Sequence, residues 1–326
     1  MKKIVPKQYL WSVLAIAIAL TLTCFPITET RSLSRSTTVE KPTAAACNVI
    51  QHAAGASCVP QASRRLVTLS LVTLADAIAL GEKPIASNNF YPDLDSITYL
   101  SNEDKKFELL GRSKPNLEKL LLIKPDLIIG WSNTAKEIYP LLSKIAPTAL
   151  GDFQGGPSWR SHFNFVARVL GKEKVGIEVW NHYYKRVNEL KSALGKQYQS
   201  KEISFIYIGS RGIESDVKNS FAGSILHDVG LQRPQAQSIA APYGIIRISE
   251  EELYKADGDI LFITAWNEKH KQTLIQLQQK PIWKTLRAVQ NNQVFFVNFP
   301  TWTGSNLLAA NAILDDLEKY LVRQGE

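Results

Sequence analysis

Short apolar runs alternate with longer amphipathic stretches along the chain from Arg65 onward. The apolar runs are rich in Leu, Ile and Val and stop at polar or glycine residues, which is typical of strands buried on both faces. Strands that alternate with helices predict an α/β fold with mainly parallel sheets. The predicted strands span residues 65–70, 83–87, 126–130, 147–150, 203–208, 259–264 and 293–297.

The stretches between the strands repeat apolar residues every three or four positions, as amphipathic helices do. Thr73 and Asp76 resemble a capping box, so a short helix is expected at 74–80, ending at Gly81. The longest helix, 174–194, is either an ordinary packing helix or a stiff strut between two lobes. The remaining predicted helices span residues 134–145, 159–170, 220–229 and 306–321.

Residues 116–129 resemble residues 249–262, at an offset of 249 − 116 = 133 residues. Each segment is typical of a capped helix, a tight turn and a strand. Two copies of one such unit predict two lobes of similar architecture. The matched pairs are Asn116 with Ser249, Glu118 with Glu251, Leu120 with Leu253 and Asp126 with Asp259.

Composition and charge narrow the class of protein. The chain has 326 residues, of which 45% are hydrophobic and 21% are charged, so it is neither disordered nor collagen-like nor a coiled coil. This length is enough for about two cores. The formal charge of +8 comes from 38 basic and 30 acidic residues without any long basic run, so no nucleic-acid partner is expected.

The start of the chain predicts a targeting segment. A basic stretch at 1–7 precedes the uncharged run 10–25, which is shorter than the ~20 residues of a membrane span and suits a secretory signal; a retained anchor helix is the alternative. The leucine before Cys24 lies one place later than in the usual lipoprotein pattern, so lipidation of Cys24 and cleavage elsewhere both stay open. Residues 28–46 are rich in Ser, Thr and Ala and are expected to form a flexible tether.

Two further cysteines, Cys47 and Cys58, lie close together in the sequence. In an exported chain such a pair is expected to form a disulfide, which stabilises the fold by about 3 kcal/mol in the chain-entropy model. Two unpaired thiols are the alternative. The CxxC spacing of a metal site is absent.

The sequence carries none of the common enzyme motifs. It lacks GxGxxG, GxxxxGK[ST], HExxH and GxSxG, so a nucleotide cradle, a zinc protease site and a nucleophile elbow are not expected. The five histidines are scattered without the spacing of metal ligands. We therefore expect no catalytic activity, no resident metal and no cofactor.

The residues that follow the predicted strands indicate a ligand site instead. In open parallel sheets, ligands bind outside the carboxyl ends of the strands. Arginine engages oxygen groups, and indole and phenol rings supply rigid contact area, so a cleft lined by them suits a bulky anionic or oxygen-rich ligand. Packing in the core or at the rim is the alternative for each aromatic residue. The candidates are Trp131, Ser132, Trp266 and Trp302 after strands, and Arg112, Tyr243 and Arg247 before the repeated units.

In their order and spacing, segments 65–70, 111–132, 242–266 and 302–317 resemble periplasmic iron–siderophore-binding proteins of ABC importers. The resemblance runs from about Cys47 to the C-terminus and extends to cyanobacterial members, which carry paired cysteines before the first strand. It implies the helical-backbone (class III) fold of solute-binding proteins, with two Rossmann-like α/β lobes joined by one long helix. The cargo of such proteins is a ferric siderophore, haem or vitamin B12.

The same elements predict how the chain is divided. We expect a signal segment at 1–24, a tether with the disulfide-bearing lead-in at 25–63, an N-terminal lobe at 64–171, a linking helix at 172–196 and a C-terminal lobe at 197–326. The linking helix corresponds to the strut of the family fold. Each lobe then contains one copy of the repeated unit.

The resemblance also implies roles for single residues. Arg112, in GRSKPNLE, matches an arginine that contacts the iron-ligating oxygens in hydroxamate-siderophore binders. Tyr243, in PYG, matches an aromatic residue that packs on the ligand. Trp131 and Trp302 match positions on pocket-lining loops.

Glu118 and Glu251 match two surface glutamates of the family, one in each lobe, that dock onto arginines of the permease. The alternative is that they are ordinary acidic residues in a first helical turn, where the helix dipole favours them. The 133-residue offset between them (251 − 118) places them at equivalent points of the two repeated units.

Together these features predict an exported, membrane-tethered protein that captures a ferric siderophore and delivers it to an inner-membrane ABC permease with ATPase subunits. Because the chelator brings the iron, the protein needs no direct metal ligand. Hydroxamate or citrate–hydroxamate cargo is expected, since a more negative catecholate complex would favour a more basic pocket. We expect a periplasmic monomer, held at the membrane by its signal or a lipid anchor. The alternatives are a haem or vitamin B12 carrier, whose candidate haem ligands Tyr91, Tyr243 and His162 lack distinguishing context, and a nucleotide-using α/β enzyme.

Overall fold

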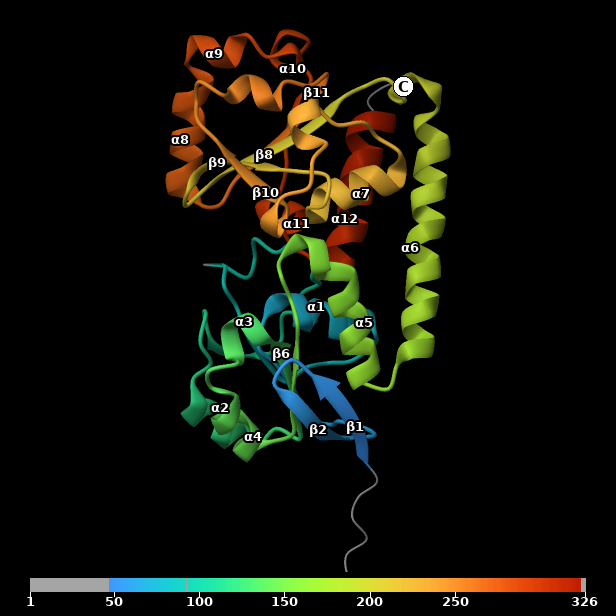
Figure 1. Ribbon diagram of the computed structural model, residues 1–326, viewed down its shortest axis with the longest axis vertical. Helices are drawn as coiled ribbons and strands as arrows, with labels where there is room; N and C mark the ends of the chain where they lie inside the picture. Colours follow the sequence, from blue (N-terminus) through green and yellow to red (C-terminus); the bar gives the residue numbers. More distant parts are fainter. Residues whose placement is uncertain (1–46, 92, 324–326) are drawn as a thin grey trace, which may run out of the picture. The chain divides into compact units, whose positions relative to one another are not determined.

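The computed structural model describes residues 47–91 and 93–323 (Figure 1). The predicted signal segment with Cys24, and the tether up to residue 46, lie outside the described residues. In the described part of the chain, no helix combines the length and the apolar character that a membrane span requires.

The N-terminal lobe is built on five parallel strands in the order β5-β4-β3-β6-β7. The central strands β3 and β6 are apolar and buried, as expected for a parallel sheet covered on both faces. The edge strand β5 was not predicted, because two of its four residues are exposed and its apolar run is short. The strands are β3 (Leu66–Thr68), β4 (Ala86–Asn88), β5 (Glu108–Gly111), β6 (Leu127–Trp131) and β7 (Thr148–Gly151).

Two helices of this lobe differ from their predictions. Helix α1 (Leu71–Ala79) begins earlier than expected because Ser70, not Thr73, is its N-cap: the Ser70 hydroxyl accepts a hydrogen bond from the Thr73 N–H at 3.1 Å. One predicted helix is instead two, α3 (Ser132–Ala135) and α4 (Tyr139–Ile145). The other helices of the lobe are α2 (Leu117–Ile123) and α5 (Trp159–Val169).

A β-hairpin precedes the lobe. Strands β1 (Cys47–His52) and β2 (Gly55–Pro60) pair antiparallel and pack against the edge strand β7. The predicted disulfide between Cys47 and Cys58 is confirmed, and it links the two strands of this hairpin. The hairpin itself was not predicted from the sequence.

The long helix α6 (Glu173–Leu194) matches its prediction closely. It packs against α5 of the N-terminal lobe and also against α7 (Phe221–Val229) and α12 (Leu307–Leu317) of the C-terminal lobe (Figure 1). Its buried residues follow one stripe: Tyr183, Val187, Leu190 and Leu194. These contacts with both lobes support the strut alternative for this helix.

The C-terminal lobe has a mixed sheet with the order β10-β9-β8-β11-β12. Strands β8, β11 and β12 are parallel, as predicted, whereas β9 and β10 are antiparallel to their neighbours and were not predicted. The fold class is therefore the expected one, two α/β lobes with mainly parallel sheets and one long helix. The strands are β8 (Ile203–Gly209), β9 (Gly212–Asp216), β10 (Ile245–Ile248), β11 (Ile260–Ala265) and β12 (Val294–Phe296).

Short helices surround this second sheet. The predicted terminal helix 306–321 is α12 followed by a π-helical turn at Glu318–Val322. Helix α11 (Phe299–Trp302) immediately precedes α12 and packs against it. The remaining helices are α8 (Glu268–Gln278), α9 (Pro281–Lys284) and α10 (Arg287–Gln290).

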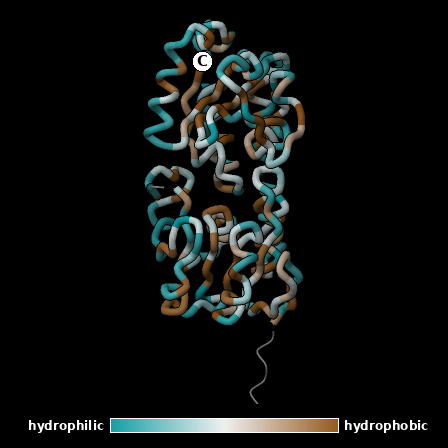
Figure 2. Tube along the Cα trace, turned by 60° about the vertical axis from the view of Figure 1, so that its left-hand side comes forward, coloured by the Kyte–Doolittle hydropathy of each residue, from teal (hydrophilic) through white to brown (hydrophobic). Residues whose placement is uncertain are grey.

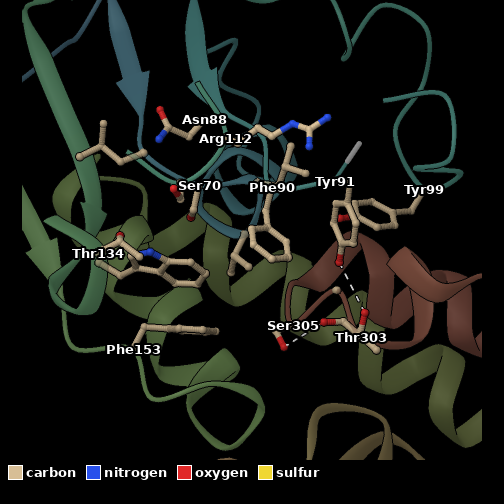
Figure 3. Close-up of a pocket in the computed structure, with 16 residues that line it drawn as sticks. Ser70, Asn88, Phe90, Tyr91, Tyr99, Arg112, Thr134, Phe153, Thr303 and Ser305 are labelled. Carbon is tan, nitrogen blue, oxygen red and sulfur yellow. Dashed lines mark hydrogen bonds between the residues drawn. The ribbon is translucent and has the colours of Figure 1, made fainter. Parts of the chain in front are cut away.

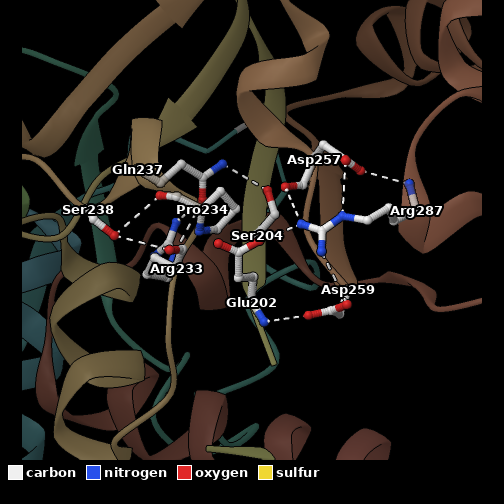
Figure 4. Close-up of polar contacts among 9 residues, drawn as sticks. All are labelled: Glu202, Ser204, Arg233, Pro234, Gln237, Ser238, Asp257, Asp259 and Arg287. Atoms are coloured by element: carbon white, nitrogen blue, oxygen red, sulfur yellow. Dashed lines mark hydrogen bonds and ion pairs between the residues drawn. The ribbon is translucent and has the colours of Figure 1, made fainter. Parts of the chain in front are cut away.

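The internal repeat is partly visible in the structure. Asp126 accepts the backbone N–H groups of Arg64 and Arg65 just before β3, and Asp259 accepts that of Glu202 just before β8. Each aspartate therefore joins two neighbouring parallel strands of its own lobe. In the C-terminal lobe Arg287 adds ion pairs to Glu202, Asp257 and Asp259 (Figure 4).

The first half of the repeated unit has different secondary structure in the two lobes. Asn116 caps α2, with its side chain accepting from the Lys119 N–H at 2.9 Å. The predicted second helix after Ser249 is instead a turn followed by a 3-10 helix, Leu253–Ala256. The prediction of a capped α-helix at this second position is therefore wrong.

One hydrophobic cluster runs through both lobes. It joins strands β3 and β6 of the first sheet to β8 and β11 of the second through side chains on α5, α6, α7 and α12. Figure 2 shows the hydrophobic positions gathered inside the lobes and the hydrophilic ones on the outer surfaces. This shared core fixes the elements from which the site described below is built.

Candidate ligand-binding site

A cavity of about 400 Å³ lies at the carboxyl ends of the strands of the N-terminal lobe (Figure 3). Its volume is within the roughly 300–1,000 Å³ of small-molecule sites. Residues from the loop between α11 and α12 complete it from the C-terminal lobe. The lining residues are Leu69, Ser70, Leu71, Val72, Asn88, Phe90, Tyr91, Tyr99, Arg112, Ser113, Trp131, Thr134, Phe153, Thr303, Gly304 and Ser305.

Parallel strands bring these residues together because all of their carboxyl ends meet at one edge of the sheet. Ser70 follows β3, Phe90 follows β4, Arg112 follows β5 and Phe153 follows β7, while Trp131 ends β6. The strand ends of the first lobe therefore line one cavity.

Aromatic side chains make up much of the cavity wall. Trp131 and Phe153 stack with ring centroids 4.3 Å apart, and the buried Trp131 Nε1–H has no hydrogen-bond acceptor in the described part of the chain. Phe90 stacks on Trp266 of the other lobe, with centroids 5.6 Å apart and planes tilted by only 2°. The Tyr91 hydroxyl lies 3.4 Å from Thr303 Oγ1, also across the lobes. The walls therefore offer flat apolar surface with few polar groups.

Arg112 is the one charged side chain among the 16 residues drawn in Figure 3. It is exposed, and within the described residues no ion pair or hydrogen bond engages its guanidinium. Gly111 (φ 147°) makes the turn that presents it, because a Cβ there would lie 2.6 Å from the Lys114 carbonyl oxygen. Burial raises the pKa values of Tyr91 and Tyr99, so both phenols stay neutral. The cavity therefore offers one unpaired positive charge to a ligand.

Among the other predicted site residues, some lie near the cavity without lining it. Trp266 reaches it through its stack on Phe90, and its buried Nε1–H also lacks an acceptor within residues 47–91 and 93–323. Ser132 begins α3 directly after Trp131. Tyr243 is 62% exposed, adopts a positive φ of 58° and lies against Gly155. Arg247 is exposed on the edge strand β10. These four residues are not part of the cavity lining.

Trp302 corrects the sequence-based expectation. Its side chain is fully buried, stacks on Phe262 with centroids 4.5 Å apart and donates from Nε1 to Asp316 Oδ2 at 2.8 Å. A ligand cannot contact it without opening the core of the second lobe. The cavity is instead lined by its neighbours Thr303, Gly304 and Ser305.

Sequence reasoning missed several lining residues, among them Asn88, Phe90 and Tyr99, and it named Tyr91 only as a candidate haem ligand. The predicted strand 83–87 stops one residue before the observed end of β4, and the residues after it were not treated as strand-end candidates. The rule that identified Trp131 would have found Asn88 and Phe90 if it had been applied to this strand.

The three candidate haem ligands are in unlike places. Tyr91 lines the cavity, Tyr243 is exposed and His162 is 1% exposed behind Trp131 and Phe153. Across the described residues, no group of three or more His, Cys, Asp or Glu side chains is arranged to hold a metal ion.

His162 gives the fold a testable dependence on pH. Its Nε2 lies 3.0 Å from Thr73 Oγ1, and burial lowers its pKa from 6.5 to about 4. Below pH 6.5 His162 takes up a proton in the unfolded chain, whereas in the folded protein it stays neutral until about pH 4. The free energy of unfolding therefore falls as the pH drops from 6.5 to about 4. At pH 5.5 this loss is about 1 kcal/mol.

Urea unfolding at pH 7.5 and pH 5.5 measures this loss. We expect the wild type to lose about 1 kcal/mol more than His162→Leu, which has no proton to bind. His182→Leu is the control, because His182 is exposed on α6. Equal losses in the wild type and His162→Leu would assign the acid sensitivity to other groups.

The two repeated glutamates have different surroundings. Glu118 is exposed in the first turn of α2. Glu251 is exposed in the turn before the 3-10 helix, and hydrogen bonds from its own backbone N–H and from Ser249, with a smaller contribution from Lys280, lower its pKa. The structure therefore retains both carboxylates at the surface, one in each lobe.

The fold and the site together define a two-lobed solute-binding protein, with a cavity at strand ends and one helix in contact with both lobes. The chain belongs to the periplasmic binding protein family, whose model matches residues 66–301. This is a family of binding proteins, not of enzymes.

Individual relatives share most of their length with this chain. It is 30% identical to the Fe(3+)-citrate-binding protein YfmC of Bacillus subtilis, over 91% of this chain and 93% of the relative. It is 28% identical to the "Probable siderophore-binding lipoprotein YfiY" of the same organism, over 89% and 92%. The structure of Staphylococcus aureus SirA complexed with staphyloferrin B superimposes with a TM-score of 0.74 and 26% identity, covering 84% of this chain and 98% of SirA.

Proposed function

We propose that this protein captures a ferric siderophore of the hydroxamate or citrate–hydroxamate type and delivers it to an ABC permease with ATPase subunits. The observation that carries the proposal is the cavity at the strand ends, with aromatic walls and one guanidinium, that of Arg112, which has no partner among the described residues. The relatives support it, because their names refer to Fe(3+)-citrate, a siderophore and staphyloferrin B.

The charge of the cavity favours this class of cargo. A ferric tris-catecholate is a trianion, and its desolvation in a pocket with one guanidinium would leave negative charge unpaired. A citrate–hydroxamate complex can be a monoanion, and a tris-hydroxamate complex can be neutral. The flat aromatic walls suit the apolar arms of such chelators, and the chelator supplies every iron ligand.

Delivery requires a surface that the permease can recognise. We propose that Glu118 and Glu251 are that surface, since each is an exposed carboxylate of one lobe. The proposed division of the chain, with lobes at 64–171 and 197–326 around a linking helix at 172–196, places one of them in each lobe. We propose a periplasmic location, with the segment up to Cys24 as signal or lipid anchor; the lipoprotein relative supports this.

A binding titration tests the proposed function. Purified mature protein is mixed with ferric schizokinen, ferric aerobactin, a ferric tris-catecholate, haem and cobalamin, and tryptophan fluorescence is followed. Quenching is expected because Trp131 lies in the cavity wall and Trp266 beside it. We expect saturable quenching by a citrate–hydroxamate complex and weaker binding of the tris-catecholate. Saturable binding of haem or cobalamin alone would contradict the proposal.

A further inference from the structure

Two consecutive buried asparagines at the end of β4 have opposite hydrogen-bonding states. Asn89 is 3% exposed and fully engaged: its Nδ2 donates to the Tyr91 carbonyl at 2.9 Å, and its Oδ1 accepts from the Tyr91 N–H at 2.9 Å. Asn88 is 2% exposed, yet neither its Oδ1 nor its Nδ2 has a hydrogen-bond partner among the residues that the structure describes. Buried amides are normally paired, so an unpaired one needs an explanation.

Asn88 belongs to the cavity. It is a lining residue, and the parallel pairing of Thr68 with Ser87 places it next to the segment that leads from β3 into α1. The Ser87 hydroxyl lies 3.4 Å from the Ser70 carbonyl, which joins the two segments directly. Figure 3 shows Asn88 and Ser70 together on the sheet side of the cavity, with Thr303 and Ser305 on the opposite side.

The first turn of α1 faces the same cavity. Leu71 and Val72 line it, and within the described residues their backbone N–H groups have no acceptor, whereas the Thr73 N–H is bonded to Ser70. The N-terminus of a helix carries partial positive charge, and its free N–H groups bind anionic oxygens. Helix α1 has 9 residues, enough for such an end.

We propose that Asn88 and the first turn of α1 form a polar subsite that binds the carboxylate and the adjacent amide of a citrate-centred ferric chelate. This inference rests on the proposed function and narrows its cargo. The N–H groups of Leu71 and Val72, which have no acceptor among the described residues, favour an anionic oxygen. The Asn88 amide requires both an acceptor and a donor.

Only some chelates meet both requirements. A citrate–hydroxamate offers a carboxylate next to the amide N–H of its arms. A chelate made of citrate alone offers acceptors but no N–H donor for Asn88 Oδ1. A neutral tris-hydroxamate such as ferrichrome offers amides but no carboxylate for α1. The subsite therefore discriminates among the hydroxamate cargoes that the overall charge of the cavity admits.

Asn88→Leu, which keeps the number and branching of the side-chain heavy atoms, tests the subsite. We expect the affinity for ferric schizokinen to fall about tenfold. The affinity for ferrichrome should stay unchanged, because ferrichrome has no carboxylate to bind the first turn of α1 and so is not held with an amide against Asn88. We expect the Tm of the ligand-free protein to rise, because the variant removes a buried unpaired amide.

Asn89→Leu is the matched control, one residue away and equally buried. It breaks two hydrogen bonds to Tyr91, so its Tm should fall. If Asn88 binds the ligand, Asn88→Leu should raise the Tm and lower the affinity. If Asn88 instead has a structural role, its replacement should lower the Tm, as in the control.

The outcomes separate this inference from the proposed function. If the wild type binds ferric schizokinen and Asn88→Leu binds it equally well, the subsite is overturned while the proposed function stands. The same holds if Asn88→Leu weakens schizokinen and ferrichrome alike, because the residue then does not read the carboxylate-bearing class. If the wild type binds no ferric chelate, the proposed function itself fails.

Discussion

Replacing Arg112 with alanine is expected to weaken ferric-siderophore binding about 10- to 150-fold, the loss of one charge-assisted hydrogen bond or pair of bonds. Arg112 is the one charged residue of the cavity lining and has no partner within the described part of the chain. Its removal therefore takes the only formal positive charge from the lining without breaking an internal contact. Tm should stay unchanged, and the Kd is read from tryptophan quenching.

Two further variants sharpen this prediction. Arg112→Lys keeps the charge but loses the planar pair of donors, so its affinity should lie between those of the wild type and the alanine variant. Arg247→Ala removes an equally exposed arginine on β10, outside the lining, and should leave the Kd unchanged. An unchanged Kd in Arg112→Ala, or an equal loss in Arg247→Ala, would show that the ligand does not sit in this cavity.

The fold followed from the sequence wherever a strand is a plain apolar run. Strands β3, β6, β8 and β11 are of this kind, and all four are found close to where they were predicted. Strand β9 has the sequence GIESD and was missed, because Glu214 and Asp216 are polar yet buried. Glu214 is paired by the Tyr207 hydroxyl and by Arg211, which no local pattern reveals.

The sequence indicates the sheet edge at which the cavity lies, but not every residue that lines it. The rule that parallel sheets bind ligands at their strand ends predicts Arg112 and Trp131 at one edge of the sheet, and both residues line the cavity. The same rule put Trp302 there, although it is buried against Phe262. An indole after a strand is equally suited to a core and to a cleft, and only the packing of α11 and α12 decides between them.

Sequence patterns do not show whether a buried polar side chain has a hydrogen-bond partner. Asn88 and Asn89 are identical neighbours, and only the structure shows that one is fully paired and the other not. Asn88, on which the proposed cargo specificity depends, was therefore not among the residues that the sequence predicted for the site.

The double replacement of Glu118 and Glu251 by alanine should leave ferric-siderophore affinity unchanged while iron uptake through the importer falls at least about tenfold. Both carboxylates are exposed and neither lines the cavity, so cargo capture does not depend on them. Complementary charges on a permease would steer and orient docking, and their loss slows productive encounter. Each single variant should cost less than the pair, because the other lobe still engages.

Two other exposed glutamates provide a control for this double replacement. Glu173 and Glu268 are exposed glutamates in the first turns of α6 and α8, as Glu118 is in α2, but neither belongs to the repeated units. If Glu118 and Glu251 act merely as surface carboxylates, Glu173→Ala with Glu268→Ala should affect uptake to the same degree. We expect the control pair to take up iron normally, at equal protein level and physiological salt. Normal uptake in the Glu118 and Glu251 pair would instead reduce these two residues to local surface charges and move the permease contact elsewhere.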